Sequence, residues 1–232
     1  MSTLNEYTVT KSSPNLRYPA IIAGVGLLAM AVLGGVAIIG GLDQLIDQSS
    51  FGETIANLTS EPDRFRFATL SVFAVAVLDV IVALALWAYF KAVSSVLAGA
   101  TAVLRIVYAG VFFFAISQLF EIWPYLAAAS TNADQAQIVF GKALRFYAIW
   151  DLGLGIFGLH LIFLGLVVFK VYYTPKWIGI LLAIAGLGYV IDTLDSALFM
   201  DRIPDLSMMT FIGEVVFMLW LLLLGRSDHV ET

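Results

Sequence analysis

Two opposite charges lie inside long apolar runs, and they are the residues of this sequence best placed for chemistry. Asp79 falls in the run 67–90 and Arg105 in the run 95–120, and each is 13 residues from Ala92 in the turn between them. If both runs are helices folded back on one another, the two charges lie at one depth, roughly 20 Å from the turn. An unpaired charge at that depth in a bilayer costs several kcal/mol, so we expect the two side chains to meet.

This pair of charges admits two interpretations. As a functional group it relays protons or ions, or acts as the counter-ion of a ligand. As a structural group it fixes the register of the hairpin, because small neighbours such as Ala76 and Ala102 allow the helices to approach closely. We place the structural interpretation first and the functional one second.

A single histidine, His160, lies within the apolar run 145–170. A haem iron would need a second axial ligand, such as Met30 or Met218, and no spacing selects one. A zinc site needs several converging ligands, so we predict no metal site and no cofactor. We expect His160 to hydrogen-bond to a neighbouring helix. Asp151 lies on the opposite side of a straight helix and cannot share a site with it.

If both chain ends are cytoplasmic, four carboxylates fall in the outer third of their spans: Asp151, Asp192, Asp195 and Glu214. At similar depth they could line a vestibule that binds a cation or an amine, or that holds protons. The alternative is that they mark hydrated helix ends at the membrane surface. No catalytic residue is predicted, because the sequence contains no phosphate-binding loop, nucleophile elbow or catalytic triad.

The elements that must position these side chains are helices. The chain is 61% hydrophobic and 12% charged, whereas a soluble domain carries about 25% charged residues. Lipid as the outer solvent explains the difference. We predict an all-α polytopic integral membrane protein, a six-transmembrane-helix bundle. The predicted spans are about 19–41, 67–90, 95–120, 145–170, 177–197 and 206–224.

The connection 42–66 is polar and carries five acidic residues, but its apolar residues have roughly helical spacing. It is expected to form one or two short helices at the membrane interface, broken by Gly52 and Pro62. A solvated loop with helical turns is the alternative. A second loop, of about 20 residues, is expected after the third span.

Both chain ends are expected to be cytoplasmic. The transmembrane domain covers 18–225, between a disordered tail at 1–17 and a polar tail at 226–232. Cytoplasmic loops carry an excess of lysine and arginine beside the spans. This topology places six of them on the cytoplasmic side: Lys11, Arg17, Lys91, Lys170, Lys176 and Arg226.

Several short stretches carry a family resemblance: Leu78-Asp79-Val80, Ala83-Leu84-Ala85-Leu86, Leu104-Arg105-Ile106, Gly158-Leu159-His160-Leu161, Leu164-Gly165 and the run Pro175 to Asp192. Through them the chain resembles a family of multi-span prokaryotic membrane proteins, the domain of unknown function 4386, over roughly residues 18–200. The resemblance implies an all-helical integral membrane protein and carries over no activity, cofactor or substrate. It places Asp79, Arg105, His160 and Asp192 at motif positions, without separating folding from function.

These observations favour a non-enzymatic membrane protein of the prokaryotic plasma membrane, an accessory or sensor-like bundle or a subunit of a larger complex. A small proton- or cation-coupled transporter that uses buried Asp, Arg and His residues is the alternative. An intramembrane lipid-modifying enzyme is a remote third. The expected partners are the lipid bilayer and other membrane subunits or a second copy of the chain. The net charge of −5 gives no support for nucleic acid.

Overall fold

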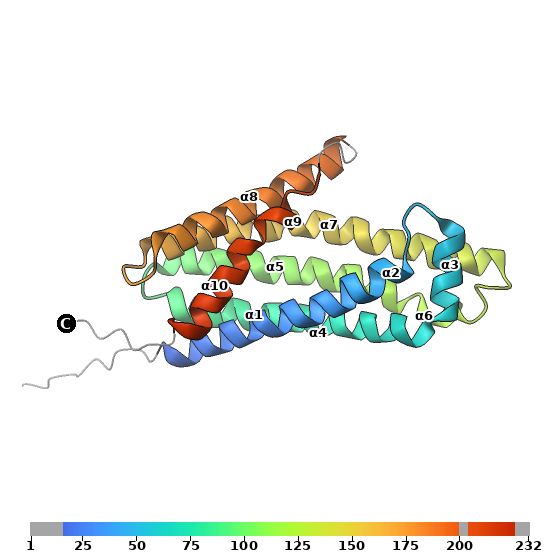
Figure 1. The fold of residues 1–232 in the computed structure, drawn as a ribbon, viewed down its shortest axis with the longest axis horizontal. Helices are drawn as coiled ribbons and strands as arrows, with labels where there is room; N and C mark the ends of the chain where they lie inside the picture. The colour runs from blue at the N-terminus through green and yellow to red at the C-terminus, as the bar shows by residue number, and fades with distance from the viewer. Residues whose placement is uncertain (1–15, 200–203, 226–232) are drawn as a thin grey trace, which may run out of the picture.

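The computed structural model describes residues 16–199 and 204–225, and this part of the chain contains helices and turns but no strand. Figure 1 shows the helices gathered in one elongated bundle. In chain order they are α1 (Arg17–Ala37), the π-helical segment η1 (Ile38–Leu42), α2 (Asp43–Leu45), α3 (Phe51–Ser60), α4 (Pro62–Phe90), α5 (Ser95–Phe120), α6 (Trp123–Leu126), α7 (Ala133–Lys170), α8 (Lys176–Phe199), α9 (Ser207–Thr210) and α10 (Ile212–Leu223). The predicted tails lie outside the described residues, except for 16 and 17.

Six helices form a closed ring. Each of α1, α4, α5, α7 and α8 packs against the next in that order, and α10 closes the ring by contacting both α8 and α1. The bundle has two unlike ends (Figure 1). We call the end where α1 begins and α10 finishes the terminal end, and the opposite end, which carries α3 and α6, the α3 end.

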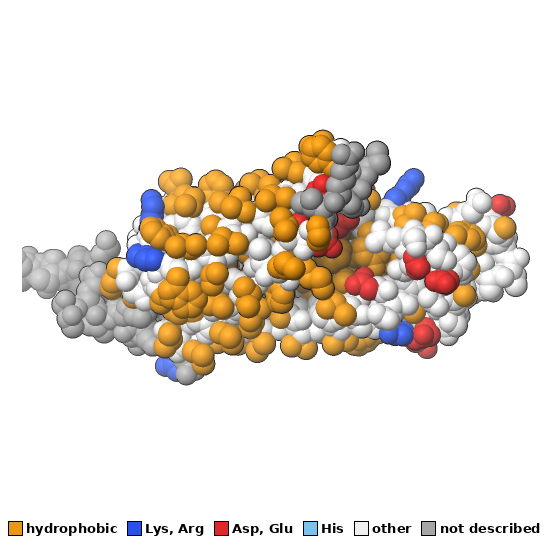
Figure 2. All heavy atoms as spheres, turned by 45° about the horizontal axis from the view of Figure 1, so that its top comes forward, with side chains coloured by type: hydrophobic (Ala, Val, Ile, Leu, Met, Phe, Trp, Pro, Cys, Tyr) orange, Lys and Arg blue, Asp and Glu red, His pale blue; other side chains and the backbone are white. Residues whose placement is uncertain are grey.

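Five of the described helical segments are long and apolar enough to cross a membrane. Figure 2 shows the matching surface, a broad belt of hydrophobic side chains over the part of the bundle nearer the terminal end. The predicted third span, 95–120, coincides with α5. The segment predicted as a sixth span is instead the short pair α9 and α10. With 12 residues, α10 is about 18 Å long, less than the roughly 30 Å of a bilayer core.

Two helices extend well beyond their predicted spans at the α3 end. Helix α7 has 38 residues, about 57 Å, and begins at Ala133 rather than near residue 145. The expected 20-residue loop is therefore largely wrong. Asn132 supplies the reason, because its side chain accepts hydrogen bonds from the backbone amides of Asp134 and Gln135 and caps the helix. Helix α4 likewise begins at Pro62, with the proline in its first turn.

The polar connection folds as helix α3, which confirms its helical interpretation. The Ser50 side chain accepts a hydrogen bond from the Glu53 amide and caps the helix. The predicted break at Gly52 is wrong, because this glycine lies within the first turn of α3. Pro62 does separate α3 from α4. Together with the projecting parts of α4 and α7, α3 forms a polar cap beyond the apolar belt (Figure 2).

Helices α7 and α8 cross through glycines on both sides. A Cβ atom at Gly158 would lie 2.5 Å from the Gly186 carbonyl oxygen, and one at Gly165 would lie 2.5 Å from that of Gly179. Real Cβ atoms do not approach so closely, so both pairs must remain glycine at this spacing. Small residues permit this kind of backbone contact in membrane helices. It holds His160, which lies between the two α7 glycines, in a fixed position.

Candidate functional site

The two intramembrane charges form an ion pair in the core of the bundle. Arg105 Nη2 lies 2.8 Å from Asp79 Oδ1, and the two side chains are 2% and 1% exposed. The hairpin of α4 and α5 therefore brings them together as their matched depth predicts. Such a buried pair costs several kcal/mol if one partner is removed, because the other charge stays in a low-dielectric interior.

His160 of α7 joins the pair from the other side of the guanidinium. Its Nε2 lies 3.2 Å from Arg105 Nη1, and its Nδ1 lies 2.8 Å from the Thr101 carbonyl oxygen. A guanidinium only donates hydrogen bonds, so Nε2 must be the acceptor and carry no proton. Nδ1 then carries the ring proton and donates it to the carbonyl. We assign His160 as a neutral imidazole on these contacts.

Two further residues complete the surroundings of Arg105. The Met30 sulfur of α1 lies 3.8 Å from Nη2, and the Phe157 ring of α7 lies 5.3 Å from the guanidinium carbon. Thr101 also donates its hydroxyl to the His160 carbonyl oxygen at 3.0 Å, which ties α5 to α7 a second time. The ionic cluster, defined here as Asp79, Arg105, His160, Thr101 and Met30, thus links four helices.

The sequence did not predict that Met30, Thr101 and Phe157 surround Arg105. Thr101 precedes Arg105 by one helical turn, and that spacing was its only signal. Met30 and Phe157 reach the guanidinium from other helices, which no spacing within one run reveals.

The four other acidic residues predicted as site residues, Asp151, Asp192, Asp195 and Glu214, have different surroundings. Asp192 accepts hydrogen bonds from the backbone amides of Leu206 and Ser207, at 2.9 and 2.7 Å, and so caps the start of α9. The Asp151 backbone carbonyl accepts the hydroxyl of Thr193, which fixes α7 to α8. The side chain of Asp195 is buried, with 8% exposed.

Glu214 lies near the start of α10 and turns toward the ionic cluster. Its carboxylate interacts with the Tyr189 hydroxyl of α8 and is within electrostatic range of Arg105 and Asp79. Its Oε1 atom is buried and accepts no hydrogen bond. Of these four predicted carboxylates, Glu214 is thus the one that the fold brings toward Asp79 and Arg105.

A second polar feature, which we call the cap pocket, lies at the α3 end. It has a volume of about 560 Å³ and an open mouth. Acidic and amide side chains line it from α2, the following loop and α3: Asp43, Gln44, Asp47, Gln48, Glu53 and Asn57. Tyr147 of α7 closes one side and donates its hydroxyl to Asp43 at 2.9 Å. The sequence indicated the acidic connection but not this pocket, because Tyr147 belongs to a distant helix.

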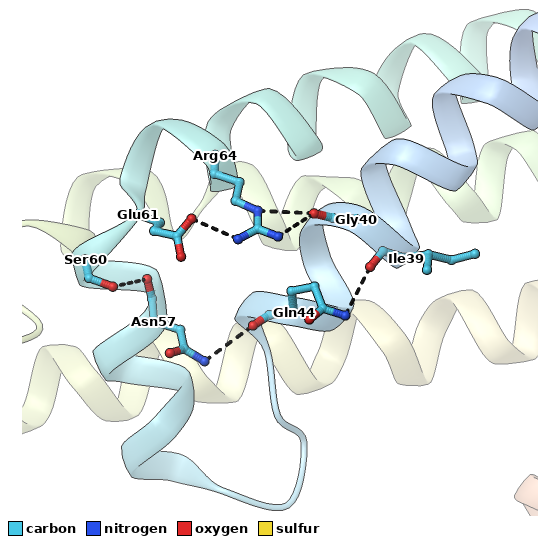
Figure 3. Close-up of polar contacts among 7 residues, drawn as sticks. All are labelled: Ile39, Gly40, Gln44, Asn57, Ser60, Glu61 and Arg64. Carbon is cyan, nitrogen blue, oxygen red and sulfur yellow. Dashed lines mark hydrogen bonds and ion pairs between the residues drawn. The ribbon is translucent and has the colours of Figure 1, made fainter.

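The π-helical turn η1 shapes the wall next to the cap pocket. Arg64 donates to the Gly40 carbonyl oxygen from Nε and Nη2, at 3.1 and 2.7 Å, and also binds Glu61 at 2.9 Å (Figure 3). The carbonyl groups of a π-turn are freed from regular helical bonding, so this arginine satisfies one of them. The side-chain amide of Asn57 donates a further hydrogen bond to the backbone carbonyl oxygen of Gln44 (Figure 3).

The loop that borders the pocket holds an ionised carboxylate. Hydrogen bonds from the Ser49 hydroxyl and amide, at 2.6 and 2.8 Å, lower the pKa of Asp47. The charged form accepts both bonds, so it is favoured over the protonated form.

Within the described ranges, no group of three or more His, Asp or Glu side chains could hold a metal ion.

The ring of long apolar helices around a buried ion pair is typical of a helical membrane protein. A family model described as "Domain of unknown function (DUF4386)" matches residues 22–225. The chain belongs to this family. A relative from Archaeoglobus fulgidus, named "Uncharacterized protein", is 35% identical over 168 residues, which cover 72% of this chain and 90% of the relative. No solved structure matches the chain.

Proposed function

We propose that the chain is a non-enzymatic multi-pass membrane protein, an accessory or sensor-like bundle that works within a larger membrane assembly. The observation that carries the proposal is the enclosure of the ionic cluster. Asp79, Arg105, His160 and Thr101 are each at most 2% exposed and bind one another across α4, α5 and α7. A cluster so closed serves to pin helices, because a reaction centre must admit a substrate.

The polar cap supports the sensor-like part of the proposal. Its acidic pocket stands beyond the apolar belt, where water-borne ligands have access. The wall of the pocket belongs to α2 and α3, while Tyr147 sits on α7, the helix that also carries His160. A ligand between these elements would act directly on a helix that spans the bundle.

We place the terminal end in the cytoplasm of a prokaryotic cell and the cap on the other side of the plasma membrane. Three lysines flank the spans at the terminal end: Lys91 after α4, Lys170 at the end of α7 and Lys176 at the start of α8. An excess of positive charge beside the spans favours the cytoplasmic side. The archaeal relative supports the prokaryotic assignment.

Native purification tests the assembly. The tagged full chain, extracted from its own membranes in mild detergent, is expected to elute in a complex of fixed stoichiometry with a second membrane protein or a second copy. Cross-linking before extraction would guard against loss of a weak partner. A monomer that retains no partner even after cross-linking, and whose deletion changes no activity of a membrane complex, would overturn the proposal.

A small proton-coupled transporter is the second candidate, and one observation favours it. Glu214 Oε1 is buried without a hydrogen bond, beside Tyr189 and within range of the ion pair. Ionisable groups in membrane helices often mark ion pathways. Transport requires water to reach the ionic cluster from at least one side, so solvent access at Asp79 separates this candidate from the first.

A further inference from the structure

The charges at the centre of the bundle do not balance unless one carboxylate is protonated. Arg105 supplies one positive charge, and His160 is neutral because its Nε2 accepts from the guanidinium. Asp79 and Glu214 supply two negative charges when both are ionised. The centre would then carry a net charge of −1 within the apolar belt, which costs several kcal/mol.

The contacts identify which carboxylate takes the proton. Asp79 is bound directly to Arg105 at 2.8 Å, so its ionised form is compensated. Glu214 has no direct ion pair in the described part of the chain, although its Oε1 is as buried as the oxygens of Asp79. Its near neighbour is the Tyr189 hydroxyl, a neutral group. Protonation therefore stabilises Glu214, because this carboxylate has no cation to balance its charge.

Every helix packed around this point is consistent with that assignment. The titratable or charged groups that face Glu214 are Asp79 of α4, Arg105 and Tyr108 of α5 and Tyr189 of α8, with Asp192 facing Tyr189 along α8. Helix α1, which also contacts α10, has titratable groups only at Arg17 and Tyr18, at the terminal end. No second cation among the described residues faces Glu214 to balance it.

Glu214 lies in the first turn of α10, near the surface of the bundle. Phe211 and Ile212, three and two residues before Glu214, are 48% and 56% exposed. Glu214 itself is only partly buried although its Oε1 is enclosed. Helix α9, whose first amides are bound by Asp192, directly precedes α10 in the chain. Part of the Glu214 residue therefore borders the surface of the bundle.

From this charge count and geometry, we propose that Glu214 is a proton-binding site that keeps the membrane-embedded centre neutral. The bound proton comes from water, converts the carboxylate to the acid and changes the charge of the centre from −1 to 0. Release of the proton leaves Glu214 as a second anion within reach of Arg105. Asp79 and Glu214 then compete for one guanidinium, which couples the proton to the pairing of α4 and α5. This site goes beyond the structural role proposed for the bundle.

Infrared spectroscopy of the full chain in lipid nanodiscs tests the proposal. At neutral pH we expect the carbonyl-stretch band of a protonated carboxylic acid, which deuterium exchange shifts. The band should disappear in Glu214→Gln, an uncharged mimic of the protonated form. It should persist in the control Glu121→Gln, which changes a carboxylate that is 54% exposed and paired with Lys142. The Tyr189→Phe variant should shift the band by removing the neighbouring hydroxyl.

Two arms keep the test decisive. Thermal unfolding checks that Glu214→Gln is folded. If it is not, native protein labelled with carbon-13 at glutamate carboxyl groups answers the question, because only a glutamate band then moves. Absence of the band at neutral pH overturns the proposal. So does a band that survives in folded Glu214→Gln or that ignores the glutamate label.

Discussion

Removing the charge of Asp79 should be the most damaging single change in the ionic cluster. In Asp79→Leu the Arg105 guanidinium, 2% exposed, loses the carboxylate that lies 2.8 Å away. Its other contacts, His160 and Met30, are neutral. Removing one partner of a buried pair costs about 3–5 kcal/mol. Because Glu214 is within electrostatic range and offers partial compensation, we expect the lower end, about 3 kcal/mol.

The double variant separates pairing from packing. Asp79→Leu with Arg105→Met removes both charges, and a well-packed apolar replacement of a buried pair is often neutral. We expect its free energy of unfolding to lie within about 1 kcal/mol of that of the native chain. The remaining loss comes from His160 Nε2, which then has no hydrogen-bond partner. The assay is reversible unfolding in mixed micelles, followed by tryptophan fluorescence. If the two single changes are each harmless and their effects add, Asp79 and Arg105 do not pin the helices.

Other predictions follow from individual contacts. Gly158→Ala should destabilise by about 1–3 kcal/mol in the same unfolding assay, because its Cβ would meet a carbonyl oxygen of α8 at 2.5 Å; Gly110→Ala, with open space around it, should lose nothing. Asp192→Ala should cost about 0.5–2 kcal/mol by uncapping α9, and equal stability would refute that role. Asp47 should titrate below an ordinary aspartate by carbon-13 NMR, and Ser49→Ala should raise its pKa toward the usual value. Since the folded-state pKa is lowered, the stabilisation from Asp47 is present above its unfolded pKa and is lost as the pH falls through the folded value.

The depth of charges in apolar runs was enough to predict the core of the site. Asp79 and Arg105 pair because no other placement of two midplane charges is as favourable, and that argument needs only their distance from the turn. The boundaries of α5 were predicted from its apolar run, which begins directly after the Ser94 that caps the helix. Met30 could not be assigned, because its contact with Arg105 depends on how α1 packs against α4.

The start of α7 and the break between α9 and α10 were not predicted, because the length of an apolar run does not give the length of a helix. Helix α7 continues about 12 residues beyond its apolar stretch, and only the Asn132 cap signals its true start. The run 206–224 was read as one span, whereas Thr210 and Phe211 end α9 and α10 starts anew. In this arrangement Glu214 lies beside Tyr189 of α8 rather than at a hydrated helix end.

Solvent access at the ionic cluster is the measurement that bears most directly on the bundle as a closed, helix-pinning structure. The chain has no cysteine, so single cysteines report cleanly. We expect Ala76→Cys and Ala109→Cys, one helical turn from Asp79 and Arg105 and 0% exposed, to resist membrane-impermeant thiol reagents applied from either side. Ser49→Cys, at the exposed cap pocket, should react fully. Rapid labelling at Ala76→Cys or Ala109→Cys in folded protein would contradict the closed cluster and favour a transport pathway.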